Sequence, residues 1–197
     1  MKEMINTYGF LGLIQLIYFK IRTFFLFKNA KIIRFPIRIR GKKFISVGKG
    51  FTTGFNCRID AYSNKKEKVI YIGENVQIND YVHIGAIEKI EIGDNVLIAS
   101  KVFITDHNHG SYSGIDNDSP FSIPKNRKLY SSKVVIEKNV WLGEFVSVLP
   151  GVRIGEGSII GTMSVVNKNI PPFSIAVGSP ARVIKKYNKD SKIWEKI

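Results

Sequence analysis

Only one cysteine, Cys57, occurs among the 197 residues of the sequence. A single cysteine cannot form an internal disulfide, which argues against a disulfide-stapled secreted scaffold and favours a reducing compartment. No histidine lies near Cys57 in the sequence. We therefore interpret Cys57 as a small apolar residue of the repeat region defined below, and not as a reactive thiol.

Acidic residues are scarce, because 16 Asp and Glu stand against 30 Lys and Arg and give a formal net charge of +14. Such an excess fits a nucleic acid, an anionic membrane surface or a polyanionic small molecule as the partner. Between Met1 and Lys43, ten basic residues are interleaved with apolar stretches, and Glu3 is the single acidic residue. No nucleic-acid-binding fold accompanies this charge, so we expect no nucleic acid partner.

The sequence also lacks an unbroken apolar run of the about 20 residues that a transmembrane helix needs. Tyr8–Phe19 is a run of twelve residues without a charge, and Lys20 and Arg22 separate it from the next apolar residues. A signal peptide would need small residues at a cleavage site after this run, where aromatic residues stand instead. We expect residues 1–43 to form a basic amphipathic helical segment. Residues 1–30 would either lie at an anionic membrane surface or pack on the rest of the protein.

Neither a Walker-type GxxxxGK[ST] motif nor a Rossmann GxGxxG motif is present, although the chain has 17 glycines. Many of these glycines belong to a repeat in which an apolar residue returns every six positions. The interval breaks between Ile59 and Ile72, slips by two residues before Ile92 and has one long interruption after Ile104. The apolar positions of these hexads are Val47, Thr53, Ile59, Ile72, Ile78, Ile84, Ile92, Ile98, Ile104, Ile136, Leu142, Val148, Ile154, Ile160 and Val166.

Self-similarity at so short a period predicts a solenoid, because each unit can bury its apolar residue only by stacking on copies of itself. Three hexads make one triangular coil, with a short strand on each flat side and Gly-Asp-Asn or Gly-Glu-Asn at the corners. The glycine density and the β-branched inward positions exclude a continuous helix. We expect an all-β solenoid over residues 44–180, followed by a short helical tail over residues 181–197.

Three further stretches carry a resemblance: ITDHNHG at 104–110, VWLGE at 140–144 and PPFSIAVGSPARVIKK at 171–186. Together with the hexads they resemble the hexapeptide-repeat acyltransferases, most of all bacterial lipopolysaccharide and capsule O-acetyltransferases, and more distantly galactoside and maltose acetyltransferases. The resemblance implies a left-handed parallel β-helix, a homotrimer, acetyl-CoA as co-substrate and no metal. It also implies transfer of an acetyl group to a sugar hydroxyl of a surface-polysaccharide precursor. The left-handedness rests on the resemblance alone, because crossover connections are usually right-handed.

The long interruption of the repeat predicts where the chemistry lies. Loops of this length inside a regular array are usually functional, and we expect residues 106–131 to protrude from the coil. In the family that the chain resembles, a Thr-x-His arrangement at this place carries the catalytic histidine, and Thr105-Asp106-His107 matches it. Acyl transfer to an alcohol needs a base, so His107 is the predicted general base. His109 is a predicted substrate contact.

The resemblance also implies binding residues. Asn79 matches an asparagine near the acceptor hydroxyl, across a subunit boundary. Trp141 would form an apolar wall for the pantetheine arm of CoA, and backbone groups of Glu144 and Thr162 would bind its amides. Basic and polar residues farther along would bind the adenosine phosphates: Asn167, Lys168, Arg182 and Lys185.

Two alternatives stay open at this point. Zinc hydratases that resemble γ-type carbonic anhydrases use the same coil with three histidines and a water, and this chain has three histidines, His83, His107 and His109. An acetyltransferase for a soluble sugar or an antibiotic is the second alternative. For the favoured function, we expect a cytoplasmic enzyme, peripheral on the inner face of the membrane if its saccharide acceptor is lipid-linked.

Overall fold

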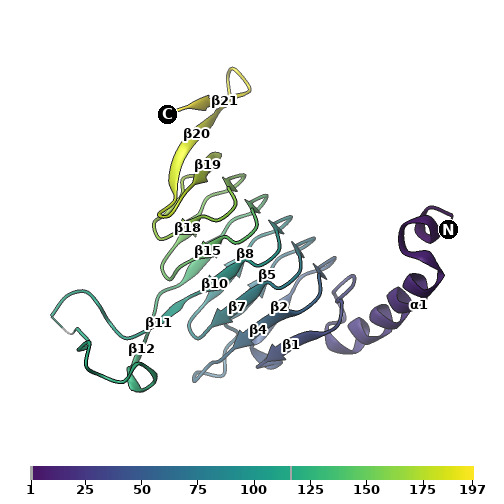
Figure 1. Ribbon diagram of the computed structural model, residues 1–197, viewed down its shortest axis with the longest axis horizontal. Coiled ribbons are helices and arrows are strands. Elements are labelled where there is room, and N and C mark those ends of the chain that lie inside the picture. Colours follow the sequence, from purple (N-terminus) through teal and green to yellow (C-terminus); the bar gives the residue numbers. More distant parts are fainter. Residues whose placement is uncertain (1, 116) are drawn as a thin grey trace.

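The computed structural model describes residues 2–115 and 117–197 as a three-sided coil from which a helix, a loop and a hairpin project (Figure 1). Side 1 is a parallel sheet of β2 (Ile45–Val47), β5 (Ile70–Ile72), β8 (Ile90–Ile92), β13 (Val134–Ile136) and β16 (Arg153–Ile154). Side 2 contains β3 (Thr52–Thr53), β6 (Gln77–Ile78), β9 (Leu97–Ile98), β14 (Trp141–Leu142), β17 (Ile159–Ile160) and β19 (Ser174–Val177). Side 3 contains β1 (Ile37–Arg40), β4 (Cys57–Ala61), β7 (His83–Ala86), β10 (Phe103–Thr105), β15 (Ser147–Val148) and β18 (Val165–Val166).

From β2 to β18, successive strands of the coil fall on the three sides in turn, because each hexad supplies one side. The parallel register brings the same hexad position of each coil above that of the preceding one. On side 3 the aligned inward residues are fully buried and form one column: Ile59, Ile84, Ile104, Val148 and Val166. Burying each such side chain contributes about 1.5–3 kcal/mol, so the stacked columns are the main source of stability.

The corners between sides 1 and 2 show why the corner triplets end in asparagine. Asn75, Asn95 and Asn139 have φ of 54°, 57° and 60°, the left-handed region that asparagine tolerates better than most residues. Their side chains also form a ladder between coils. Asn75 donates to Asn95 at 3.3 Å, and Asn95 donates to Asn139 at 3.2 Å. The corner role predicted for Gly-Glu-Asn at 73–75 and Gly-Asp-Asn at 93–95 is confirmed.

Cys57 lies inside the coil, as its place in the repeat predicts. Its Sγ is 3.0 Å from the carbonyl oxygen of Asn79, and burial raises the pKa of the thiol to about 11. At neutral pH the thiol therefore stays protonated and is a poor nucleophile.

The C-terminal helix expected over residues 181–197 is wrong. The chain forms a hairpin instead, with β20 (Arg182–Asn188) antiparallel to β19 and β21 (Ile193–Lys196) antiparallel to β20. The reason is the free edge of β19, which offers backbone hydrogen bonds to a segment whose side chains alternate between exposed and half-buried. The rings of Tyr187 and Trp194 then pack at 5.4 Å across the hairpin.

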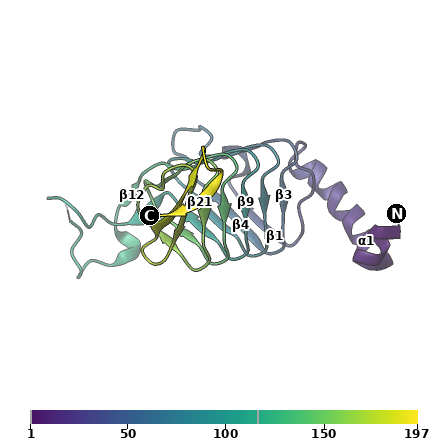
Figure 2. The same ribbon diagram turned by 90° about the horizontal axis from the view of Figure 1, so that it is seen from above.

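The N-terminal segment is a helix, α1 (Lys2–Leu26), with a non-helical break at Gly9. It leaves the first coil and projects beyond the end of the coil (Figure 2). A short 3-10 helix, η1 (Lys42–Phe44), follows β1. The attachment of α1 uses Phe19, which packs on Phe35 and Phe55 at 5.9 and 5.8 Å, and Thr23, whose Oγ1 accepts the Ile33 amide at 2.7 Å.

The expected amphipathic contrast of α1 is absent, because its solvent-facing side is apolar as well as the side that faces the coil. The exposed residues of this apolar stripe are Phe10, Leu11, Ile14, Ile17, Ile21, Phe24 and Phe25. The helix continues through Lys20 and Arg22, so the apolar length of Ile5–Leu26 reaches 22 residues, enough by length and composition to cross a membrane. Arg22 lies over the ring of Phe35 at 3.9 Å, and Lys20 donates to the carbonyl of Lys31. Both cations are therefore bound to the coil end of the protein.

Between β10 and β13 the chain leaves the coil, and this loop projects far to one side in Figure 1. Its base is a two-stranded antiparallel ribbon of β11 (His107–His109) and β12 (Leu129–Ser131), and η2 (Pro124–Asn126) lies beyond it. His107 pairs with Ser131, and His109 pairs with Leu129. The interruption of the repeat thus delivers His107 at the point where the chain turns out of the coil.

Candidate active site

His107 is held by the two residues that precede it. Its Nδ1 lies 2.8 Å from Asp106 Oδ1 and 3.3 Å from Thr105 Oγ1. A carboxylate can only accept, so the network assigns the proton of the neutral ring to Nδ1 and leaves Nε2 unprotonated. The side chain is 21% exposed, which leaves the ring accessible from outside. An oriented imidazole with a free Nε2 is suited to take a proton from a hydroxyl.

Asp106 is fully buried and is fixed by the coil below it. Its carboxylate accepts the amides of Ile87, Glu88 and Lys89 at 2.8–3.1 Å, at the corner one turn earlier. These amides replace the water that a buried carboxylate loses, so the charge is stabilised inside the protein. Asp106 thereby joins the corner of one coil to the histidine of the next.

A small open space lies in front of His107 because residue 85 is glycine. A Cβ atom on Gly85 would lie 3.7 Å from His107 Cε1 and 3.8 Å from His83 Nε2. Both rings therefore reach the space that a side chain would fill, which we call the Gly85 slot. Burial, and after it the positive charge of Arg58, lower the pKa of His83, so this ring is neutral at pH 7. A neutral imidazole can both donate and accept a hydrogen bond beside His107.

The other predicted acceptor residues lie apart from the Gly85 slot within one chain. His109 is exposed on β11, two residues beyond His107. Asn79 is half-buried at the corner that precedes β7, where its Oδ1 accepts from Gln77 at 3.1 Å. The Gly85 slot and His107 are associated with the opposite end of β7. Asn79 of the same chain is thus not beside His107.

The residues predicted to bind the pantetheine arm stack on one corner of the coil, between sides 2 and 3. Trp141 is 48% exposed on β14, and Thr162 Oγ1 donates to the carbonyl of Glu144 at 2.8 Å. The same carbonyl accepts the Met163 amide at 2.8 Å, so its acceptor capacity is used. Within residues 2–115 and 117–197, the amides of Glu144 and Thr162 make no hydrogen bond. These amides, and not the Glu144 carbonyl, are the backbone groups available to a ligand.

The residues predicted to bind the phosphates lie near the last coil. Lys168 and Arg182 line one hollow of about 310 Å³, together with Asn169, Ile170, Ala181 and Val183. Asn167 is exposed at the same corner, and Lys185 is half-buried on β20. The structure therefore brings Lys168 and Arg182 together. Lys168 follows β18 at the corner between sides 3 and 1, whereas Arg182 pairs with Val177 at the end of β19, near the corner that carries Thr162.

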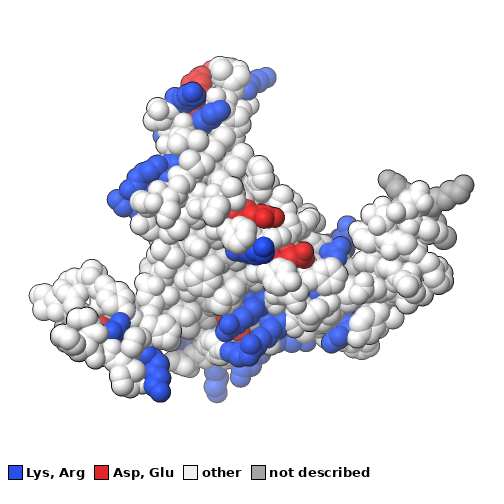
Figure 3. Space-filling view, in the orientation of Figure 1, with Lys and Arg blue, Asp and Glu red and all other residues white. Residues whose placement is uncertain are grey.

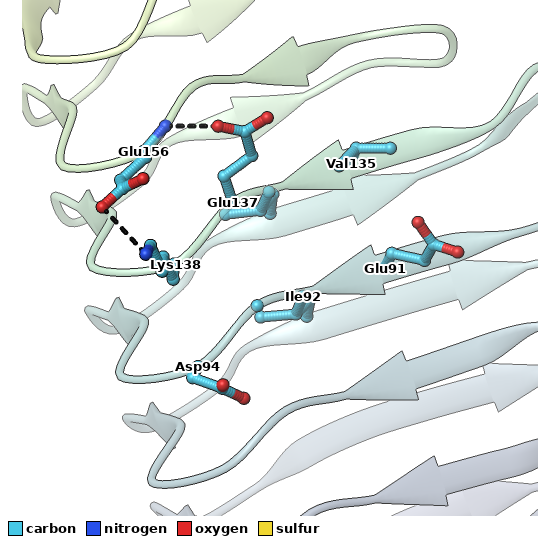
Figure 4. Close-up of a pocket in the computed structure, with 9 residues that line it drawn as sticks. Glu91, Ile92, Asp94, Val135, Glu137, Lys138 and Glu156 are labelled. Atoms are coloured by element: carbon cyan, nitrogen blue, oxygen red, sulfur yellow. Dashed lines mark hydrogen bonds and ion pairs between the residues drawn. The ribbon is translucent and has the colours of Figure 1, made fainter.

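Two further hollows, both lined by described residues, bear on the site. One, of about 480 Å³, lies on side 1 and is lined by acidic residues. Figure 4 shows Glu137 and Glu156 there, with the Glu156 amide donating to Glu137 at 2.7 Å and Lys138 pairing with Glu156 at 3.3 Å. Since its carboxylates repel CoA phosphates, we assign this hollow no substrate. In the part of the chain that the structure describes, no three or more His, Cys, Asp or Glu side chains form a group that could hold a metal.

The second hollow, of about 780 Å³, lies between residues 62–69, the corner at residues 87–89, and β12. It is adjacent to the Asp106 cap, because Asp106 accepts the amides of that corner. Its charged lining consists of Glu67 and Glu88 with four lysines: Lys65, Lys89, Lys128 and Lys133. Lys89 and Lys133 are each paired with Glu91 at 2.7 Å, so the hollow keeps only a small positive excess, and its volume is sufficient for a saccharide.

The sequence did not indicate Gly85 or Asp106 as site residues, and it offered His83 only as a ligand in the zinc alternative. Asp106 is the middle residue of the Thr-x-His motif. It lies two positions after Ile104, the inward residue of its hexad, and this spacing was a signal that Asp106 could be buried beside His107. No local signal marks Gly85. It becomes part of the site only because β7 pairs with β10, in the register that sets Gly85 beside Thr105.

Comparison with known proteins agrees with this geometry. Residues 133–168 match the family model described as bacterial transferase hexapeptide (six repeats). The chain is 48% identical over 195 residues to WbbJ of Escherichia coli K12, named as a lipopolysaccharide biosynthesis O-acetyl transferase, and the match covers 98% of both chains. Over 123 residues it is 39% identical to galactoside O-acetyltransferase of the same organism, covering 62% of this chain and 57% of that protein.

Among solved structures, an N-acyltransferase from Bacillus cereus, AntD, in complex with dTDP-4-amino-4,6-dideoxyglucose and coenzyme A superposes with a TM-score of 0.67. The two are 26% identical, and the match covers 82% of this chain and 84% of that one. The match to an acetyltransferase over nearly the whole chain agrees with three features described above: the hexad repeat, the parallel coil and the oriented histidine. The chain belongs to the hexapeptide-repeat acetyltransferases, which take their acetyl group from acetyl-CoA.

Proposed function

We propose that this protein is an O-acetyltransferase that moves an acetyl group from acetyl-CoA to a sugar hydroxyl of a surface-polysaccharide precursor, with His107 as the general base. The observation that carries the proposal is the Asp106–His107 pair at 2.8 Å, in a ring whose Cε1, the carbon between the two nitrogens, borders the Gly85 slot. The similarity to the E. coli lipopolysaccharide O-acetyl transferase supports the class of acceptor.

In the proposed reaction, the acceptor hydroxyl enters the Gly85 slot and His107 Nε2 takes its proton as the oxygen attacks the thioester carbonyl. A bond forms between this oxygen and the acetyl carbon. The carbon–sulfur bond then breaks and CoA leaves as thiolate, which takes the proton back from the imidazolium. Asp106 stabilises the imidazolium while it exists, since its negative charge lies against Nδ1. Backbone amides are suited to stabilise the oxyanion that forms on the carbonyl oxygen.

The proposed assembly is a homotrimer with left-handed coils and active sites between neighbouring copies. Its support is the separation of the site residues within one chain. Trp141, Glu144 and Thr162 line the corner between sides 2 and 3, whereas His107 leaves the coil at the corner between sides 3 and 1. One copy can supply the pantetheine corner and Asn79, and the next can supply His107. The predicted donor and acceptor residues then meet in one groove.

The function is tested by CoA release from acetyl-CoA in the presence of separate acceptors. The panel contains neutral sugars, amino sugars and fragments of surface polysaccharides, with product mass and alkali lability recorded to distinguish an ester from an amide. We expect an alkali-labile ester on a polysaccharide fragment. Transfer only to an amine, or to no saccharide in the panel, would contradict the proposal.

The Gly85 slot yields a prediction about acceptor entry. Gly85→Ala should fold normally, because its new Cβ meets only ordinary contacts at 3.7 and 3.8 Å and the backbone of Gly85 needs no positive φ. The methyl group occupies the space intended for the hydroxyl, so we expect kcat/KM for the acceptor to fall by about tenfold or more. Acetyl-CoA binding should be unchanged in calorimetry. Ser113→Ala in the projecting loop is the control, because Ser113 is exposed and only its backbone carbonyl accepts a hydrogen bond, and an unaltered kcat/KM in Gly85→Ala would reject the slot.

We further propose a cytoplasmic enzyme bound peripherally at the inner membrane face through α1. Its exposed apolar stripe has no cover within the described residues. Lys20 and Arg22 lie within the same stretch of the helix, and Lys28 and Lys31 follow it. Replacing Phe10, Leu11, Ile14 and Ile17 by serine should abolish sedimentation with phosphatidylglycerol vesicles and preserve turnover of a soluble acceptor. Ile193→Ser/Ile197→Ser is the matched control. Retained sedimentation, or loss of the trimer instead, would show that the stripe packs against protein.

A further inference from the structure

Beside the Gly85 slot, side 3 carries three arginines, Arg38 and Arg40 of β1 and Arg58 of β4, which we call the arginine cluster. Arg38 pairs in register with Arg58 and Arg58 with His83, so these three side chains form a row on the outer face. The next row is Arg40, Asp60, Gly85 and Thr105. Figure 3 shows Lys and Arg atoms gathered over β1 and β4. The cluster and His107 thus belong to one continuous surface.

One buried carboxylate, Asp60, organises the cluster. Its side chain is 5% exposed, and its Oδ2 lies 2.5 Å from both Nε and Nη2 of Arg58 and 3.7 Å from His83 Nε2. Its Oδ1 lies 3.8 Å from Arg40 Nε, too far for a hydrogen bond, and has no hydrogen-bond partner among the described residues. Asp60 neutralises one of three guanidinium charges. The surface beside the slot therefore keeps an excess of two positive charges.

The guanidinium groups also have unused donors. Arg40 donates only to Tyr62 Oη, at 3.2 Å, and within residues 2–115 and 117–197 Arg38 makes neither a hydrogen bond nor an ion pair. Arg40 and Arg58 are each 41% exposed, so a ligand can reach them. A guanidinium binds a phosphate or a carboxylate through two parallel hydrogen bonds, and an Arg pair does so better than lysines.

The spacing fits a substrate that reaches from the cluster to His107. Neighbouring strands lie about 4.8 Å apart, so Arg40, two strands from Gly85, is about 10 Å from the slot. One sugar ring with an ester phosphate bridges such a distance. The hollow of about 780 Å³ begins at Tyr62, the residue that Arg40 contacts, and leaves room for a longer saccharide.

We propose that the arginine cluster binds an oxyanion of the acceptor, a phosphate ester on the sugar that reacts at His107 or a carboxylate of an acidic sugar. This inference rests on the proposed function, since it describes the substrate of the same site. It places the acceptor along side 3, with its reactive hydroxyl in the Gly85 slot and its anionic group over β1 and β4. The enzyme then selects an anionic saccharide over its neutral counterpart.

The test compares three forms of the best acceptor sugar: the methyl glycoside, the 1-phosphate and the methyl glycoside of the uronic acid. We expect one anionic form to have a KM about tenfold lower than the neutral form, as two charge-assisted hydrogen bonds at an exposed site allow. Arg38→Gln/Arg40→Gln should remove this advantage and leave the KM of the neutral glycoside unchanged. Preference for the 1-phosphate identifies a phosphate ester, and preference for the uronate identifies an acidic sugar.

Two variants serve as controls. Arg38→Lys/Arg40→Lys keeps the charges and should restore part of the preference. Arg153→Gln, which removes one arginine on side 1, should change nothing. Equal KM values for the neutral and both anionic forms in the parent protein would overturn the inference. A loss of the trimer in Arg38→Gln/Arg40→Gln would overturn it as well, because the cluster would then be a contact between copies.

Binding of inorganic pyrophosphate, measured by calorimetry without acetyl-CoA, separates this inference from the proposed function. If no saccharide is acetylated but the parent protein binds pyrophosphate and Arg38→Gln/Arg40→Gln does not, the anion site stands and the proposed function fails. If sugars are acetylated without preference for an anionic form, the function stands and the anion site fails. Absence of both turnover and pyrophosphate binding would reject the two together.

Discussion

Replacing His107 by alanine is expected to lower kcat for the acceptor by about 10²–10⁴, the range that general base catalysis contributes. The reason is chemical, because a sugar hydroxyl has almost no anion at neutral pH and the ring of His107, which borders the Gly85 slot, is the one that a carboxylate orients through Nδ1. The ring is not part of the coil core, so the variant should melt close to the parent temperature. Stopped assays of CoA release over a range of acceptor concentrations measure kcat and KM separately.

Three observations accompany this expectation. Acetyl-CoA should bind His107→Ala with nearly the parent affinity, because the pantetheine corner at Trp141 belongs to another side of the coil. Added imidazole should restore part of the turnover in the cavity that alanine leaves. His107→Gln, which fills the volume without supplying a base, should remain as slow as alanine. Turnover within a factor of three of the parent in either variant would show that another group takes the proton.

Much of the fold could be predicted from the hexads, because the inward columns require an apolar residue at every sixth position and few other folds produce this interval. The six-residue spacing of apolar residues is absent at both ends of the chain. In β1, Ile37 and Ile39 alternate with Arg38 and Arg40, which is the ordinary period of a strand, and only pairing with β4 makes this segment a side of the coil. The C-terminal segment was mistaken for a helix for a related reason, since its partner, the edge of β19, is not visible in its own sequence.

The candidate site shows the same division. His107 could be predicted, because a histidine at the long interruption of the repeat has a motif around it. The Gly85 slot could not, since Gly85 and His107 come together through the register of β7 and β10, and one displaced residue would put a side chain there. The arginine cluster was hidden for the same reason. Arg40, Asp60 and Gly85 are far apart in sequence, and they form one row only after the coils stack.

Asp106→Asn is expected to lower kcat by about 10²–10⁴ while the chain still folds, and it has the second largest expected effect. The carboxylate fixes the proton of His107 on Nδ1, and an amide can present its NH₂ group there and favour the other tautomer. The proton of the ring would then be on Nε2, and this nitrogen could no longer accept a proton from the hydroxyl. The remaining amide oxygen can still accept one or two of the corner amides at Ile87, Glu88 and Lys89.

Asp106→Ala separates the role in positioning from the role in folding. Alanine leaves the three corner amides without their acceptor, and each buried group left unpaired costs about 1–3 kcal/mol, so this variant should melt well below both the parent and Asp106→Asn. The pH profile of kcat gives the readout that a purely structural role would not change. Asp106→Asn should alter the acidic limb of this profile, where a general base is protonated and inactive, while KM for acetyl-CoA stays constant. If Asp106→Asn instead lost stability as Asp106→Ala does and kept the parent pH profile, Asp106 would be a corner cap alone, and His107 would owe its orientation to Thr105.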